Sequence, residues 1–117
     1  MQRNVNPRVG DVWDVEFDPV VGHEQGGRRP ALIISNDEFN DTPHGLCIVA
    51  PFTTTDRGVR AHVRVEPPEG GLARRSVIMP EQAKSASVLR VWKFRGRVSP
   101  DTLVQVQKAV GLFIDRP

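Results

Sequence analysis

The stretch Asp11-Val12-Trp13-Asp14-Val15-Glu16-Phe17 decides the fold class, because polar and apolar side chains alternate along it. A period of two residues predicts a strand with one buried face. Similar short β-type runs follow, and ten glycines and ten prolines punctuate the whole chain between them. These runs predict further strands over residues 31–35, 46–53, 60–66, 76–79 and 93–98.

The C-terminal segment changes to a helical period. Its apolar side chains at helical spacing are Leu103, Val106, Val110, Phe113 and Ile114. Ser99 can cap this helix, Pro100 fits its first turn and Asp101 suits its N-terminus. A weaker helical turn is predicted near residues 86–89. We therefore predict a mainly β fold with a C-terminal helix, in one domain over residues 1–117, and a small SH3-like β-barrel is one architecture that fits.

Composition places the chain among globular proteins, with 38% hydrophobic and 26% charged residues. No apolar run approaches the roughly 20 residues of a membrane span, and the N-terminus lacks the apolar core of a signal peptide. We therefore expect a cytoplasmic protein. The single cysteine, Cys47, lies in an apolar run, and we interpret it as a small buried side chain rather than a nucleophile.

Charges are segregated although the net charge is only +2. Residues 10–56 hold nine acids and two bases, whereas residues 57–97 hold ten bases and three acids. Most of the bases are arginine, which binds phosphates in bidentate fashion and stacks on bases. Charge alone leaves two interpretations open: a surface for nucleic acid or an acidic partner, and a solvated face without a specific role.

The loop over residues 18–30 is the most unusual stretch, with three glycines and two prolines. The backbone N–H groups of Gly26-Gly27 can approach a phosphate and Arg28-Arg29 can clamp it. Glu24, beside His23, is an acid/base candidate. The pattern indicates an anion-binding loop, and the alternative is a flexible hairpin tip with incidental charges.

Two further polar stretches follow predicted strands. Thr53, Thr54 and Thr55 can hydrogen-bond a phosphate, although turn formation is the commoner role of such residues. Residues 81–85 read alone as a solvated loop. The three histidines lack metal-ligand spacing, so we expect no metal and no cofactor, and we assign His44 and His62 surface or capping roles.

Several stretches together match one family pattern, in order, over about residues 9–114. They are Gly10-Asp11-Val12-Trp13, Phe17-Asp18-Pro19, Val21 to Gly27, Arg29-Pro30-Ala31, Ile33 to Asp37, Val49-Ala50-Pro51 with Thr53, His62-Val63 and Glu81 to Ser85. In these residues the chain resembles the MazF/PemK toxin family of toxin–antitoxin systems.

The resemblance implies an SH3-like barrel that forms homodimers. It implies a toxin that cuts single-stranded RNA at short motifs without a metal, leaving a 2′,3′-cyclic phosphate and a 5′-hydroxyl, and so inhibits translation and growth. It also implies a cognate antitoxin whose acidic, disordered tail covers the RNA site.

The resemblance also implies roles for particular residues. The family's catalytic arginine and threonine fall on Arg29 and Thr53. Its RNA-contacting residues fall on His23, Glu24, Gln25, Glu81 and Gln82. The chain departs from the common pattern in having His23 before Glu24, Arg28 before Arg29, and Ala83 after the Glu-Gln pair. None of these departures removes a catalytic residue, but they leave the cleavage sequence open, because loop residues read the bases.

Chemical reasoning adds further candidates. Arginine is a poor base, so we take Glu24 as the hypothetical general base, with His23 behind it. Base recognition requires aromatic or arginine planes on which unstacked bases lie. The further RNA-binding candidates are Phe17, Arg28, Thr54, Arg57 and Lys84.

Two rival interpretations remain open. One is a gyrase-directed toxin with the same barrel, although the chain lacks the Trp-Gly-Ile end that contacts gyrase in that family. The other is a non-catalytic relative kept for antitoxin binding.

Overall fold

The computed structural model describes residues 5–18, 22 and 26–115. Its strands are β1 Asp11–Glu16, β2 Arg28–Ile33, β3 Leu46–Thr53, β4 Val63–Val65, β5 Ser76–Ile78, β6 Lys84–Ser87 and β7 Val91–Arg97. Its helices are α1 Asp37–Asn40 and α2 Pro100–Ile114, with 3₁₀ turns η1 Glu69–Gly71, η2 Pro80–Gln82 and η3 Val88–Arg90. None of the described helices is long and apolar enough to cross a membrane.

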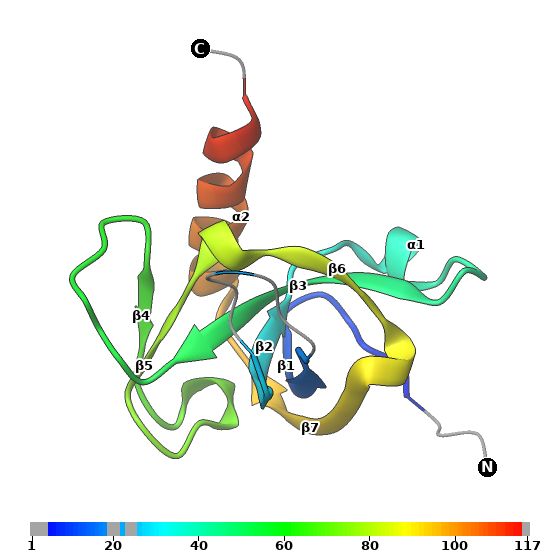
Figure 1. Cartoon of the computed structure of the whole chain (residues 1–117), viewed down its shortest axis with the longest axis horizontal. Coiled ribbons are helices and arrows are strands. Elements are labelled where there is room, and N and C mark those ends of the chain that lie inside the picture. The colour runs from blue at the N-terminus through cyan, green and yellow to red at the C-terminus, as the bar shows by residue number, and fades with distance from the viewer. Residues whose placement is uncertain (1–4, 19–21, 23–25, 116–117) are drawn as a thin grey trace.

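The strands form one antiparallel sheet in the order β4-β5-β3-β2-β1-β7. The first half of β3 pairs with β6 and its last two residues pair with β5, so β3 lies at the centre of the fold. Figure 1 shows the bent strands wrapped around a common centre, with α2 projecting from one side. The predicted fold class, a mainly β sheet with a C-terminal helix, is confirmed.

Most predicted strands are present with shifted ends. The strand at residues 46–53 matches β3, and the alternating stretch from Asp11 forms β1. The run at residues 60–66 is a strand only over Val63–Val65, because the backbone N–H of His62 closes a turn onto the carbonyl of Val59 at 3.1 Å. The helical turn predicted near residues 86–89 is a 3₁₀ turn over Val88–Arg90, directly after β6.

Two clusters of buried side chains form the core. The first gathers Val12, Leu32, Phe52, Ile78 and Val106, and the second gathers Val15, Phe17, Ile33, Cys47 and Val91, among others. Strand β1 contributes to both clusters, because Val12 and Val15 are three residues apart and therefore point to opposite faces of the strand.

The C-terminal helix is held at its start by side chains. The hydroxyl of Ser99 accepts a hydrogen bond from the N–H of Thr102 at 3.2 Å, as a helix N-cap does. A carboxylate oxygen of Glu69 accepts from the N–H of Ser99 and the hydroxyl of Thr102. Val106 is fully buried in the first cluster, so this end of α2 belongs to the core.

Close backbone contact joins η1 to β7 at two glycines. Gly71 has a φ of +66°, and a Cβ placed there would lie 1.8 Å from the carbonyl oxygen of Arg95. A Cβ on Gly96 would in turn lie 2.8 Å from the nitrogen of Gly71. Only glycine at both positions allows this approach.

Candidate active site

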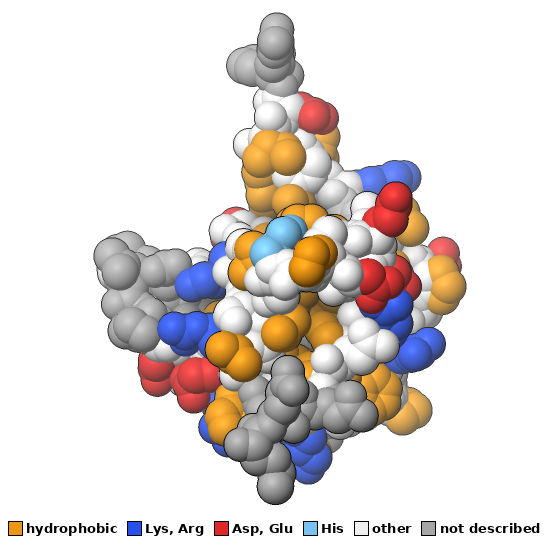
Figure 2. Space-filling view, turned by 90° about the vertical axis from the view of Figure 1, so that its right-hand side faces the viewer, with side chains coloured by type: hydrophobic (Ala, Val, Ile, Leu, Met, Phe, Trp, Pro, Cys, Tyr) orange, Lys and Arg blue, Asp and Glu red, His pale blue; other side chains and the backbone are white. Residues whose placement is uncertain are grey.

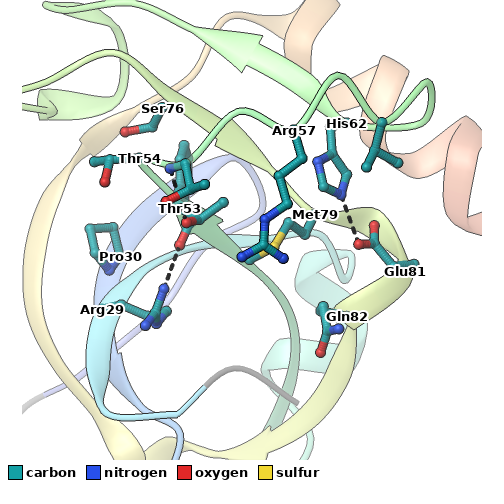
Figure 3. A pocket seen from close by; sticks show the side chains of 13 residues that line it. Arg29, Pro30, Thr53, Thr54, Arg57, His62, Ser76, Met79, Glu81 and Gln82 are labelled. Carbon is teal, nitrogen blue, oxygen red and sulfur yellow. Dashed lines mark hydrogen bonds and ion pairs between the residues drawn. The ribbon is translucent and has the colours of Figure 1, made fainter. Parts of the chain in front are cut away.

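A cavity of about 690 Å³ is lined by residues in or next to the four neighbouring strands β2, β3, β5 and β4. The sequence-predicted residues that line it are Arg29, Thr53, Thr54, Arg57, Glu81 and Gln82. His62 and Met79 line it as well. Figure 3 shows Arg29 and Thr53 on one side of the cavity and His62 and Glu81 on the other.

Strand register brings these residues together from four parts of the sequence. Ala31 pairs with Pro51, and Phe52 pairs with Ile78, which also pairs with Val63. Arg29 and Thr53 lie two residues beyond the first of these pairs. Met79 and His62 lie next to the other two pairs, on the side of Pro51, so the site gathers around the C-terminal half of β3. The N–H of Met79 donates to the carbonyl of Pro51 at 2.9 Å and extends this row to η2.

The guanidinium of Arg29 is fixed by two backbone carbonyls. Its Nε donates to Gly26 O at 3.1 Å and one terminal nitrogen donates to Phe52 O at 3.3 Å. A guanidinium carries five N–H donors, so the group keeps donors for a ligand while its plane is held. Such a fork can bind two oxygens of one phosphate.

Thr53 is the last residue of β3. When the pairing of Ala31 with Pro51 is continued by two residues, Thr53 lies opposite Arg29 on the neighbouring strand β2. Its Oγ1 accepts a hydrogen bond from the N–H of Thr55 at 3.2 Å. That bond uses an acceptor lone pair and leaves the hydroxyl hydrogen as a donor toward the cavity. Arg29 and Thr53 therefore offer several donors for one anionic group.

His62 has a different position from the one predicted. Sequence reasoning gave it a surface or capping role, and that prediction is wrong, because its side chain is only 7% exposed. Its Nε2 lies 2.7 Å from Oε2 of Glu81, across the cavity from Arg29. The match of His62-Val63 to the family pattern was the one sequence signal for this residue.

The loop after Thr53 carries a second ordered carboxylate next to the cavity. The N–H of Gly58 and the guanidinium of Arg64 donate to Asp56, each at 2.9 Å, and they hold the pKa of that carboxyl below its usual value. These bonds shape the loop from which Arg57 reaches over the cavity (Figure 3).

Three predicted RNA-binding residues do not line this cavity. Arg28 lies 3.9 Å from Glu16 and 4.2 Å above the ring of Trp92, since neighbouring strand residues point to opposite faces. Lys84 lines a separate cavity of about 230 Å³. Phe17 is only 3% exposed within the second core cluster, so the prediction that its ring stacks on bases is wrong.

His23, Glu24 and Gln25 lie outside the described residues. The two ends of their loop are joined, because the N–H of Phe17 donates to Gly27 O at 2.9 Å. The N–H of Gly27 donates to Asp18 at 2.8 Å.

Cys47 is fully buried, and burial raises the pKa of its thiol to about 11. The interpretation of this residue as a buried apolar side chain is therefore confirmed. Among the described residues, no three His, Cys, Asp or Glu side chains gather in a group that could hold a metal ion.

Solved structures of MazF share this fold. MazF from Deinococcus radiodurans aligns with a TM-score of 0.85 and 28% identity, covering 95% of this chain and 98% of that one. MazF of the same organism in its MazE–MazF complex aligns with a TM-score of 0.75 and 28% identity, covering 95% and 97%. Fold and site thus define a MazF-like protein.

The family assignment follows from sequence as well. A family profile described as the PemK-like, MazF-like toxin of type II toxin–antitoxin systems matches residues 8–114, and the chain belongs to this family. The endoribonuclease toxin MazF of Escherichia coli K12 is 32% identical over 113 residues, covering 92% of this chain and 94% of its own. Endoribonuclease MazF9 of Mycobacterium tuberculosis is 33% identical, covering 92% and 96%. The curated relatives are endoribonucleases, and this chain is an enzyme of their family.

Proposed function

We propose that this toxin is a sequence-specific, metal-independent endoribonuclease that cleaves single-stranded RNA. The 2′-hydroxyl attacks the adjacent phosphate and leaves a 2′,3′-cyclic phosphate and a 5′-hydroxyl. The observation that carries the proposal is the cavity that places the fixed guanidinium of Arg29 beside the hydroxyl of Thr53. By this activity the toxin inhibits translation and growth.

Arg29 is the transition-state clamp in this mechanism. Attack by the 2′-oxygen makes a five-coordinate phosphorus whose equatorial oxygens gain negative charge. A guanidinium that is already oriented by two carbonyls stabilises that charge without reorganising. Thr53 donates to one of the same oxygens or holds the 2′-hydroxyl in line.

Proton transfer is assigned to the loop between β1 and β2. Glu24 accepts the proton of the 2′-hydroxyl, with His23 as the second candidate, and Gln25 contacts RNA. The departing 5′-oxygen takes up a proton from solvent and becomes the 5′-hydroxyl. The loop of these three residues ends next to Arg29, since Arg29 itself binds the carbonyl of Gly26. Thr54, Arg57, Glu81 and Gln82 complete the RNA site around the same cavity.

A homodimer and an antitoxin are the proposed protein partners. Leu112 is 74% exposed and Ile114 is 80% exposed on α2, and apolar side chains so exposed favour a second subunit. Figure 2 shows hydrophobic side chains on the helix that projects at the top of that view. MazF of Deinococcus radiodurans is solved in complex with MazE, and we propose a cognate antitoxin with an acidic disordered tail for this chain. Its RNA substrate places the toxin in the cytoplasm.

The test is cleavage of a long single-stranded RNA by purified protein in excess EDTA, with mapping of the new 5′ ends. Discrete cuts with 5′-hydroxyl termini that disappear in the Arg29→Ala variant support the proposal. Absence of cleavage by folded protein on several unrelated RNAs contradicts it, and a gyrase inhibition assay then tests the rival function.

A further inference from the structure

In the hydrogen-bonded pair of His62 and Glu81, the imidazole is buried and the carboxylate is partly exposed. The His62 side chain is 7% exposed and the Glu81 side chain is 40% exposed, and they meet at 2.7 Å. Nδ1 of His62 is buried and has no hydrogen-bond partner among the described residues. The imidazole is therefore fixed within the protein, and the carboxylate is the part that a ligand can reach.

The partners of the ring define where its proton lies. A carboxylate only accepts hydrogen bonds, so Nε2 of His62 carries the hydrogen that Glu81 receives. This hydrogen bond engages Oε2 of Glu81 and leaves Oε1 as an acceptor at the cavity.

This acceptor lies across the cavity from Arg29, as Figure 3 shows. Arg29 and Glu81 are therefore placed for different parts of one nucleotide or of two neighbouring nucleotides. Figure 3 shows the side chains of Arg57 and Met79 between the two sides.

We propose that Glu81, positioned by His62, accepts hydrogen bonds from the Watson–Crick edge of an unstacked nucleobase, and that this subsite requires a base with an amino group. The proposal rests on the proposed function and deepens it, because it restricts one position of the cleavage motif to adenine, cytosine or guanine. His62 is a positioning residue and touches no substrate.

The chemistry of the bases supports this restriction. Adenine, cytosine and guanine each present an exocyclic amino donor on the edge that single-stranded RNA exposes. Uracil presents two carbonyl oxygens beside its one N–H, and a carboxylate repels them. The guanidinium of Arg57, which reaches over the cavity, offers a plane on which the base can stack.

In the experiment, a pool of short random-sequence 2′-fluoro RNA is incubated with the full-length protein. The RNA that stays bound is recovered and sequenced. Such RNA has no 2′-hydroxyl, so the selection reads base preference without cleavage. Cleavage of unmodified RNA is measured in parallel and reports on the proposed function separately. The variants are Glu81→Gln, His62→Ala and His62→Gln, whose side-chain amide can still donate to Glu81.

The expected result is a bound motif in which one position excludes uracil by on the order of tenfold to a hundredfold. Glu81→Gln and His62→Ala lose this exclusion and keep the rest of the motif, whereas His62→Gln retains it. Two matched controls keep the full motif: His44→Ala, whose ring binds Thr42, and Glu66→Gln, whose carboxylate binds Arg75.

The opposite results overturn the proposal. A motif that admits uracil equally at every position, or one that Glu81→Gln leaves unchanged, removes the subsite even if cleavage proceeds. Loss of the whole motif in Glu81→Gln, with the thermal unfolding of the protein unchanged, contradicts a role confined to one base. Because Glu81 is partly exposed, its substitution tests the proposal even if His62→Ala unfolds the protein.

Discussion

Replacing Arg29 tests whether cleavage depends on the two-point binding of a phosphate by the guanidinium or only on its positive charge. Arg29→Ala removes a preorganised donor to the developing phosphate charge, which we expect to lower the single-turnover rate by about 10²–10³. Arg29→Lys keeps the charge but has one point of attachment where the guanidinium has two. Losing one charge-assisted hydrogen bond costs about 1.5–3 kcal/mol, so this variant should be about 10- to 100-fold slower.

The neighbouring arginine supplies a matched control. Arg28 follows the same loop but points to the opposite face, where it lies near Glu16 and Trp92. Arg28→Ala removes the same charge one residue away and should lower the rate far less than Arg29→Ala does. Rates are measured with excess enzyme on a fluorescent oligonucleotide that contains the mapped motif, and binding is measured separately.

Two results would refute the reasoning. Equal losses in the two alanine variants would show that general charge, rather than the fork fixed by Gly26 and Phe52, carries the effect. Full activity in Arg29→Lys would show that two-point binding of the phosphate is unnecessary. Thermal unfolding of every variant separates loss of chemistry from loss of fold.

Three further predictions concern the fold. The thiol of Cys47, buried and with its pKa raised to about 11, stays protonated at neutral pH, so alkylating reagents should modify it only after unfolding, as mass spectrometry can show. Ser99→Ala removes the cap of α2 and should cost about 1 kcal/mol in urea unfolding. Gly71→Ala places a Cβ against the carbonyl of Arg95 in a left-handed conformation, and a loss of about 3 kcal/mol or more is expected; unchanged stability would contradict the close contact.

The elements of this fold are predictable because they depend on local periodicity. The alternation from Asp11 and the capped helical pattern from Ser99 give β1 and α2 nearly to the residue. Strand ends are less predictable, since they depend on turns. The turn at residues 59–62 is one case: it makes the strand begin only at Val63, and His62, which the alternation placed on the surface, lines the cavity instead.

The site could be predicted only where a motif carried it. Residue chemistry marked Arg28-Arg29 and the three threonines from Thr53 as phosphate ligands, and the family resemblance then singled out Arg29 and Thr53. Strand register explains why these two meet. Phe17 shows the limit of pattern reasoning, because it lies on the same face as Val15 and is buried in the second core cluster. His62 and Glu81 are 19 residues apart in the sequence, and they meet only because β4 pairs with β5 and β5 pairs with β3. No local sequence pattern predicts this contact.

The segregation of charge along the sequence has a structural explanation that the composition alone did not reveal. Acids of the first half pair with bases of the second half: Arg95 binds Asp14 at 2.9 Å, Arg97 lies 3.1 Å from Asp11, and Arg64 binds Asp56. Three of the arginines that suggested a nucleic-acid surface are therefore engaged in ion pairs within the protein. The charge offered to RNA at the cavity comes from Arg29 and Arg57, so cleavage should depend on a few placed arginines rather than on the total positive charge.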